Sequence, residues 1–220
     1  MAILAHDMRN PLSALLTNIH FVKSVARGGS SDVDEALSDS ALSCSILGQL
    51  IGNLEVLGRA FGASRLAPVP VNTRDVVGQA VARAAPGAKL AGIEVTITKG
   101  SPGATVLVDA LFFGRVLDNL LANSLQYSPA NGKVTIELVT AGERGGVRLI
   151  DQGPIVPPEF RERVLTAEGQ ASAKSRYEAR YGRGLAFYCA AQAASIAGAE
   201  LSIGEQDGHF LVELWGPIAR

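Results

Sequence analysis

The first sixty residues carry two stripes of apolar side chains at helical spacing. In residues 3–26 the apolar positions recur in steps of three and four, which predicts one face of an amphipathic helix. A second helix is predicted over residues 32–60, where the seam is heptad-like. A short segment containing Gly28 and Gly29 separates them. The stripes consist of Leu4, Met8, Leu12, Leu15, Ile19, Val22 and Val25, and of Leu37, Ala41, Cys44, Leu47, Ile51, Leu54 and Gly58.

Two long helices joined by a short loop cannot bury both stripes against each other alone. Pairing with a second copy into a four-helix bundle would bury them, and it is the solution we expect. The alternative is that the stripes form the ordinary core of a monomer.

Beyond the helical pair, residues 63–70 contain two prolines and few apolar anchors, which is typical of a linker between domains. Strand-like and helix-like runs alternate after it, and Thr73 is placed to cap the first helix. Asp207-Gly208 is a hairpin turn signal between the last two strands. Helices are predicted over residues 73–84, 109–126 and 185–197, and strands over 93–98, 105–108, 134–140, 147–150, 201–203 and 210–215.

This alternation predicts a mixed sheet that is covered on one face by helices. The expected fold class is therefore α+β, with an N-terminal helical hairpin that forms a dimeric four-helix bundle, followed by an α/β sandwich domain. The expected domains are residues 1–62, the linker 63–70 and residues 71–220.

Composition and charge limit the classes of function. The 220 residues are 47% hydrophobic, enough for one or two domains with real cores, and the net charge of −1 argues against nucleic acid as the main partner. Cys44 and Cys189 show no metal or disulfide spacing, so a reducing cytosol is expected. No membrane contact is expected, because no apolar run reaches the roughly 18 residues of a span and no secretory leader is present.

The segment from Ala5 to Leu12 places an imidazole, a carboxylate and a carboxamide ahead of a proline. His6 and Asn10 are four residues apart and share a helix face, while Asp7 can orient the ring and take its proton. Pro11 removes the amide that would bond the Asp7 carbonyl, so a bend is expected there. The combination indicates a site that moves a phosphoryl group. A surface histidine on an amphipathic helix is the plainer alternative.

Three further motifs follow downstream, and all four resemble the H, N, G1 and G2 boxes of sensor histidine kinases in family order and spacing. The resemblance covers essentially the whole chain. It implies a phosphoacceptor hairpin followed by the ATP-binding fold shared with gyrase and Hsp90. The four boxes are residues 5–12, 118–129 (Asp-Asn-Leu-Leu-Ala-Asn-Ser-Leu-Gln-Tyr-Ser-Pro), 151–157 (Asp-Gln-Gly-Pro-Ile-Val-Pro) and 182–187 (Gly-Arg-Gly-Leu-Ala-Phe).

The resemblance assigns roles in a nucleotide site with ATP and Mg²⁺ as cofactors. Asn123 is implied as the Mg²⁺ ligand and Asn119 as its neighbour near the phosphates, unless both lie on a solvated face. Asp151 follows an apolar strand and can accept a hydrogen bond from the adenine amino group, although an aspartate before Gly-Pro also suits a plain turn. The implied nucleotide-binding residues are Asn119, Asn123, Tyr127, Asp151, Gly153, Gly182, Gly184 and Leu185.

The chain departs from the family pattern at four positions. Gln126 stands where the family often has a cation, and Glu168 where the second phenylalanine of the F box is usual. Ile155 and Ala186 replace glycines, which predicts weakened or lost ATP binding wherever glycine served positive φ or close backbone approach. The basic residues of the expected ATP lid, which can meet the triphosphate or stay solvated, are Lys174, Arg176, Arg180 and Arg183.

The resemblance implies the catalytic core of a sensor histidine kinase: a homodimer that autophosphorylates His6 and passes the phosphoryl group to a response regulator receiver domain. Asp7 would polarise the imidazole and Asn10 would hold a water for a reverse phosphatase reaction. One alternative is a degenerate kinase that acts as a histidine phosphotransferase or pseudokinase scaffold; another is a pure binding module. Because His6 lies so near Met1, we expect a cytoplasmic fragment of a parent protein that can itself be membrane-anchored.

Overall fold

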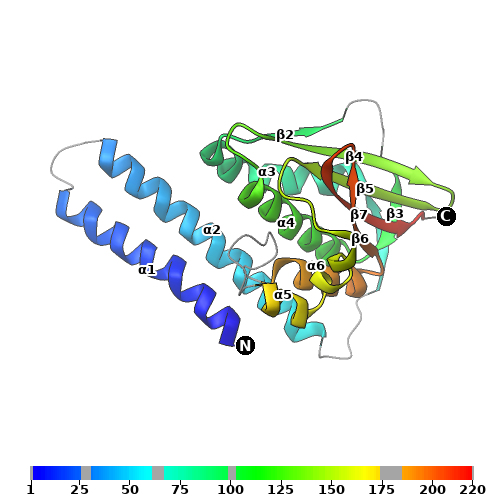
Figure 1. Cartoon of the computed structure of the whole chain (residues 1–220), viewed down its shortest axis with the longest axis horizontal. Coiled ribbons are helices and arrows are strands. Elements are labelled where there is room, and N and C mark those ends of the chain that lie inside the picture. Colours follow the sequence, from blue (N-terminus) through cyan, green and yellow to red (C-terminus); the bar gives the residue numbers. More distant parts are fainter. Residues whose placement is uncertain (1, 26–30, 61–66, 99–102, 174–184, 220) are drawn as a thin grey trace. The chain divides into compact units, whose positions relative to one another are not determined.

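A computed structural model describes residues 2–25, 31–60, 67–98, 103–173 and 185–219. The chain divides into two compact units, Met1–Glu55 and Val56–Arg220. The first unit is helical and the second contains a sheet with helices (Figure 1). Half of the predicted linker, residues 63–66, lies outside the described residues, and its last two residues belong to strand β1 (Val69–Asn72).

The first unit consists of two antiparallel helices, as predicted (Figure 1). Helix α1 spans Ala2–Val25 and continues through Pro11, and helix α2 spans Ser31–Ala60. The expectation that no segment is long and apolar enough for a membrane does not hold for α2. Its residues Val33–Arg59 meet that criterion by length and composition, because a long helix rich in Ala, Leu, Ile and Val meets it whether it packs in a bundle or crosses a bilayer.

The buried side of α2 differs from the predicted seam by one residue. Ala36, Ser43 and Leu50, seven residues apart, are at most 6% exposed. Leu37 and Ile51 of the predicted seam are 52% and 49% exposed. Two neighbouring stripes of α2 both repeat every seven residues, so the period alone could not show which one is buried within the chain.

The second unit is built on a mixed five-stranded sheet in the order β2-β4-β5-β7-β6. Strand β2 is parallel to β4, and the other neighbours are antiparallel. A separate antiparallel pair joins β1 to β3. The strands are β2 (Glu94–Ile97), β3 (Thr105–Val108), β4 (Lys133–Ala141), β5 (Arg144–Asp151), β6 (Glu200–Gln206) and β7 (His209–Pro217).

Three helices cover one face of this sheet, α3 (Thr73–Ala91), α4 (Ala110–Tyr127) and α6 (Ala186–Ala197), with α4 contacting both of the others (Figure 1). Because successive strand side chains point to opposite faces, β4 alternates between buried and partly exposed positions. The helices and sheet share one core, which confirms the predicted mixed α/β architecture. Its largest fully buried side chains include Phe113, Leu117, Leu121, Ile136, Leu149 and Leu214.

Helix α3 was predicted with the wrong cap and the wrong end. The side chain of Asn72, rather than Thr73, caps its first turn, while the buried Thr73 hydroxyl accepts a hydrogen bond from the Ala104 amide at 2.9 Å. The helix passes the predicted end at residue 84 and continues through Pro86. It ends at Gly92, where φ is 66°, the left-handed conformation that glycine adopts without cost.

Candidate nucleotide-binding site

Asp151 is held at the end of a central strand, β5. Its backbone pairs with Val134 of β4 on one side and Phe210 of β7 on the other. The side chain is 1% exposed, and the Gly153 amide donates to its Oδ1 at 2.8 Å. The hydrogen bond from the Gly153 amide forms an Asx turn, so Asp151 shapes the turn after β5. The same bond holds the carboxylate, a hydrogen-bond acceptor, in a fixed position.

Ser124 on α4 supplies the second donor to this carboxylate. Its Oγ donates to Asp151 Oδ2 at 2.5 Å, and the serine is 1% exposed. Sequence reasoning missed this contact. A hydroxyl among apolar sheet-facing positions must find a partner when it is buried, and that rule was the available signal.

The two asparagines of α4 are buried rather than solvated, Asn119 at 2% and Asn123 at 5% exposure. The Asn119 Nδ2 donates to the carbonyl of Arg115 in the preceding turn at 3.0 Å. Buried carboxamides need partners, and the oxygen of such a group suits a hard cation. Tyr127, the last residue of α4, is half-buried.

The glycine replacements fall at positions without positive φ. Among the described residues other than glycine, positive φ occurs at Asn131, Leu185 and Asp207. Ile155 is half-buried in the loop after β5, and Ala186 is the first residue of α6. Neither replacement therefore places a residue other than glycine in a left-handed conformation, and the space that the two side chains occupy can still affect a ligand.

Leu185 precedes α6 in a left-handed conformation, with φ 57° and ψ 27°. Its carbonyl accepts the first hydrogen bond of the helix from the Cys189 amide at 2.8 Å. A non-glycine residue in this region carries a cost of about 1–3 kcal/mol, and such strain concentrates at functional turns. The left-handed step of the Gly-rich motif thus lies at Leu185, one residue before Ala186.

The first part of the expected lid consists of two short 3-10 turns, Pro158–Phe160 and Arg163–Leu165, and helix α5 (Ala167–Ala173). Arg161 fixes the first turn, since its Nε donates to the Val156 carbonyl at 3.2 Å. Outside the described residues lie the four predicted lid cations, Lys174, Arg176, Arg180 and Arg183, together with Gly182 and Gly184.

His6, Asp7 and Asn10 lie on α1, in the other unit. The backbone is helical there, so His6 and Asn10 share a face, but their side chains fall outside the described ones.

The residues that the structure describes contain no cluster of three or more His, Cys, Asp or Glu that could hold a metal ion. A cage made wholly of protein ligands is therefore not found in that part of the chain. Mg²⁺ is compatible with this, since it is usually held by one or two protein oxygens together with phosphates and waters. The side-chain oxygen of the buried Asn123 can serve as such a ligand.

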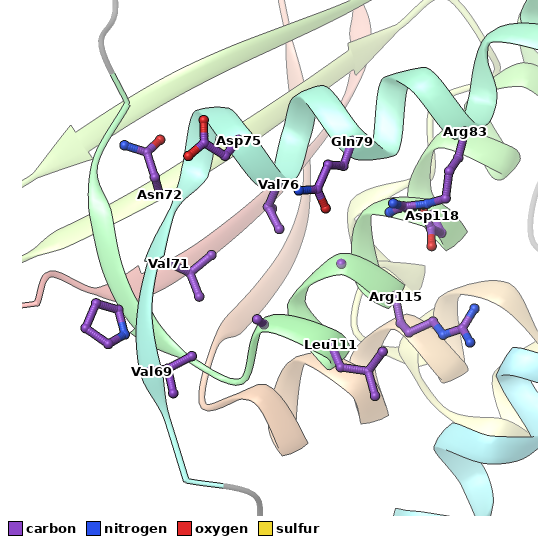
Figure 2. A pocket seen from close by; sticks show the side chains of 13 residues that line it. Val69, Val71, Asn72, Asp75, Val76, Gln79, Arg83, Leu111, Arg115 and Asp118 are labelled. Atoms are coloured by element: carbon purple, nitrogen blue, oxygen red, sulfur yellow. Dashed lines mark hydrogen bonds and ion pairs between the residues drawn. The ribbon is translucent and has the colours of Figure 1, made fainter.

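A groove of about 580 Å³ lies elsewhere in the second unit, between β1, α3 and α4 (Figure 2). Val71, Val76 and Leu111 form its apolar part. Arg83 and Asp118 lie at the other end, joined at 2.8 Å. None of the predicted nucleotide-binding residues lines it, so this groove is separate from the candidate site.

The site and fold define a class of protein. Residues 108–218 match the family described as histidine kinase-, DNA gyrase B-, and HSP90-like ATPase. The chain belongs to this family. The match runs from β3 to the end of the sheet and includes both Ser124 and Asp151.

The curated relatives that the chain resembles include proteins named as sensor histidine kinases. MprB of Mycolicibacterium smegmatis, named as a signal transduction histidine-protein kinase/phosphatase, is 29% identical over 166 residues, which cover 73% of this chain and 33% of MprB. The chain thus spans about a third of that relative's length. Full-length ShkA in complex with AMPPNP has a TM-score of 0.64 at 22% identity, covering 99% of this chain and 45% of ShkA.

The histidine kinase ThkA in complex with the response regulator TrrA has a TM-score of 0.59 at 15% identity. That match covers 99% of this chain and 60% of the other. At these identities the structural matches show the fold.

Proposed function

We propose that the chain is the catalytic core of a sensor histidine kinase that binds Mg-ATP in its second unit and phosphorylates His6 in its first. The observation that carries the proposal is the buried Asp151 carboxylate, which two donors hold beside α4 in a chain of this ATPase family. A carboxylate fixed in this way accepts a hydrogen bond from the adenine amino group. Asn123 and Asn119 serve the metal and the phosphates from the same helix.

Transfer forms a bond between a ring nitrogen of His6 and the γ-phosphorus, while the bond from that phosphorus to the β–γ bridging oxygen breaks and ADP leaves. Asp7 accepts the hydrogen on the other ring nitrogen and orients the ring. Asn10 holds a water for the reverse, phosphatase reaction. Catalysis of this type consists mostly of positioning and charge neutralisation.

The phosphoryl group then passes to an aspartate on the receiver domain of a response regulator. The complex of ThkA with TrrA supports this kind of partner. We place the reaction in the cytoplasm, where ATP and such regulators are found, and the parent protein can be anchored in a membrane.

A homodimer is proposed because the helical unit leaves much of its apolar surface uncovered. Leu12, Leu16, Leu37 and Ile51 are each between 46% and 52% exposed. A four-helix bundle formed with a second copy would cover these exposed apolar side chains. Ile51→Asp should therefore convert a dimer into a monomer in sedimentation velocity. Leu107→Asp, at a 39% exposed position of β3, is the control that should leave the dimer intact.

The kinase assignment is tested with γ-labelled ATP and Mg²⁺. The protein should take up label in an acid-labile, base-stable linkage, and His6→Ala should abolish it. Asp7→Asn should slow transfer by roughly 10² to 10⁴ with little change in nucleotide binding. Asp151→Asn should remove nucleotide binding, whereas Glu213→Gln, in an ion pair with Arg148 on the same strand pair, should not.

The outcomes separate this proposal from a phosphotransferase or pseudokinase scaffold. A flat calorimetric isotherm at millimolar Mg-ATP, combined with a His6 that still accepts phosphate from a phosphorylated regulator, would establish the scaffold. Label that persists in the His6→Ala protein would refute His6 as the acceptor.

A further inference from the structure

Each oxygen of the Asp151 carboxylate has its own donor, and the two donors come from different elements. The Gly153 amide, in the loop after β5, donates to Oδ1 at 2.8 Å. The Ser124 hydroxyl, on α4, donates to Oδ2 at 2.5 Å. One donor alone leaves a carboxyl group free to rotate about its last side-chain bond. Two donors on opposite oxygens fix the plane of the group.

We propose that Ser124 is a positioning residue that sets the selection of adenine by this site. The inference rests on the proposed function, in which Asp151 receives the adenine amino group. A carboxylate has about four lone-pair sites, so it can accept a further hydrogen bond beside those from Ser124 and Gly153. Ser124 determines where those lone pairs point.

The position of Ser124 allows no other strong role. It is 1% exposed and lies one turn after the fully buried Leu120 and directly after Asn123 on the helix. A buried hydroxyl has one proton to donate, and here that proton goes to Asp151. The link therefore connects the helix that carries Asn119 and Asn123 to the strand that carries Asp151. Base recognition and phosphate recognition are thereby placed in one rigid frame.

Inosine triphosphate is the discriminating probe. It carries a carbonyl oxygen where adenine has its amino group, so it presents an acceptor to an acceptor. A site built to receive a hydrogen-bond donor rejects an analogue that lacks it, because the buried polar group is left unpaired. That rejection depends on the carboxylate being held in place. If it can rotate or admit a water, the penalty for the inosine base falls.

The experiment measures Mg-ATP and Mg-ITP affinity by calorimetry for the wild type, Ser124→Ala, Ser124→Thr and the control Ser202→Ala, whose side chain is exposed on β6. Ser124→Ala should reduce the preference for ATP over ITP by roughly tenfold, the loss expected for one hydrogen bond to a charged group. Ser124→Thr keeps the hydroxyl and should restore the preference. Ser202→Ala should leave both affinities and their ratio unchanged, since its exposed side chain lies outside the site.

A structural role alone would lower the melting temperature of Ser124→Ala without changing the ATP-to-ITP ratio, and that result would overturn the inference while leaving the proposed function intact. A wild-type protein that binds neither nucleotide would overturn both. If Ser124→Thr fails to fold, Ser124→Cys, which keeps the size and only a weak donor, should give a ratio near that of Ser124→Ala. A Ser124→Cys ratio equal to that of the wild type would also refute the inference.

Discussion

Gln170 offers the sharpest test of the packing around the lid. It lies on α5 at 1% exposure, and neither its Nε2 nor its Oε1 has a hydrogen-bond partner among the residues that the structure describes. A buried amide without partners loses its hydration and gains nothing in return. Gln170→Leu, which has a similar volume and no polar atoms, should therefore stabilise the second unit.

The magnitude follows from the cost of an unpaired buried polar group. Mutational data place this cost at about 1–3 kcal/mol per group, and replacement by an apolar group of the same shape recovers it. In a unit of roughly 150–250 residues, 1 kcal/mol shifts the melting temperature by about 2–4 °C. Gln170→Leu should thus raise Tm by about 2–12 °C.

The assay is thermal unfolding of the whole chain without nucleotide, followed by circular dichroism. Gln152→Leu is the matched control, because the Gln152 Oε1 accepts a hydrogen bond from the Lys133 amide at 2.9 Å. Its loss should lower stability by about 0.5–1.5 kcal/mol. If Gln170→Leu lowers Tm instead, the carboxamide is not unpaired in the folded protein and the reasoning fails.

The remaining predictions concern the two cysteines, Asn72 and Ala186. Cys44 should react with a thiol reagent in the native protein, whereas Cys189 should react only on unfolding, because burial raises its thiol pKa to about 12. The pKa of the Cys189 thiol in the folded protein lies above its ordinary value of 9.0. The contribution of Cys189 to the free energy of unfolding is therefore complete below pH 9 and is lost as the pH rises from about 9 to 12, which urea titrations would measure. Asn72→Ala should cost about 0.5–2 kcal/mol in the same titrations by removing the cap of α3, and Asn72→Asp should not. Ala186→Gly should cost up to about 1 kcal/mol without tightening Mg-ATP in calorimetry, since Ala186 already has helical φ.

Sequence patterns predicted the helices and strands of the second unit well where hydrophobic periodicity agreed with turn signals. The hairpin at Asp207-Gly208 appears where it was expected, and the helix predicted over residues 109–126 is α4. Prediction failed where tertiary contacts overrode local signals. Thr73 looks like a cap, but its hydroxyl accepts a hydrogen bond from the amide of Ala104, the residue before β3. Pro86 looks like a break, but it lies inside a helix whose true end is Gly92.

The candidate site was predictable in part for a similar reason. Asp151 could be placed from the apolar strand before it, because a strand fixes where its last side chain emerges. Ser124 could not be recognised as its partner, since the contact joins residues 27 positions apart and depends on how α4 lies on the sheet. The buried register of α2 was equally hidden, because two seven-residue repeats compete along one helix.

The two glycine replacements show that the backbone conformation of a motif cannot be judged from its sequence alone. Replacement of the last G2 glycine by Ala186 predicted weakened or lost ATP binding, if that glycine served positive φ or close backbone approach. The structure has the left-handed residue at Leu185 instead, with φ 57°, and Ala186 already begins the helix. An alanine at the start of a helix costs nothing in backbone strain. The remaining argument for a pseudokinase is steric, because the methyl group of Ala186 and the branched side chain of Ile155 occupy space that a glycine would not. Steric effects of this kind change an affinity by degrees, whereas the loss of the Asp151 carboxylate would remove the adenine contact altogether. The conformational argument for a dead site therefore fails, and direct measurement of Mg-ATP binding, rather than the count of glycines, decides between kinase and scaffold.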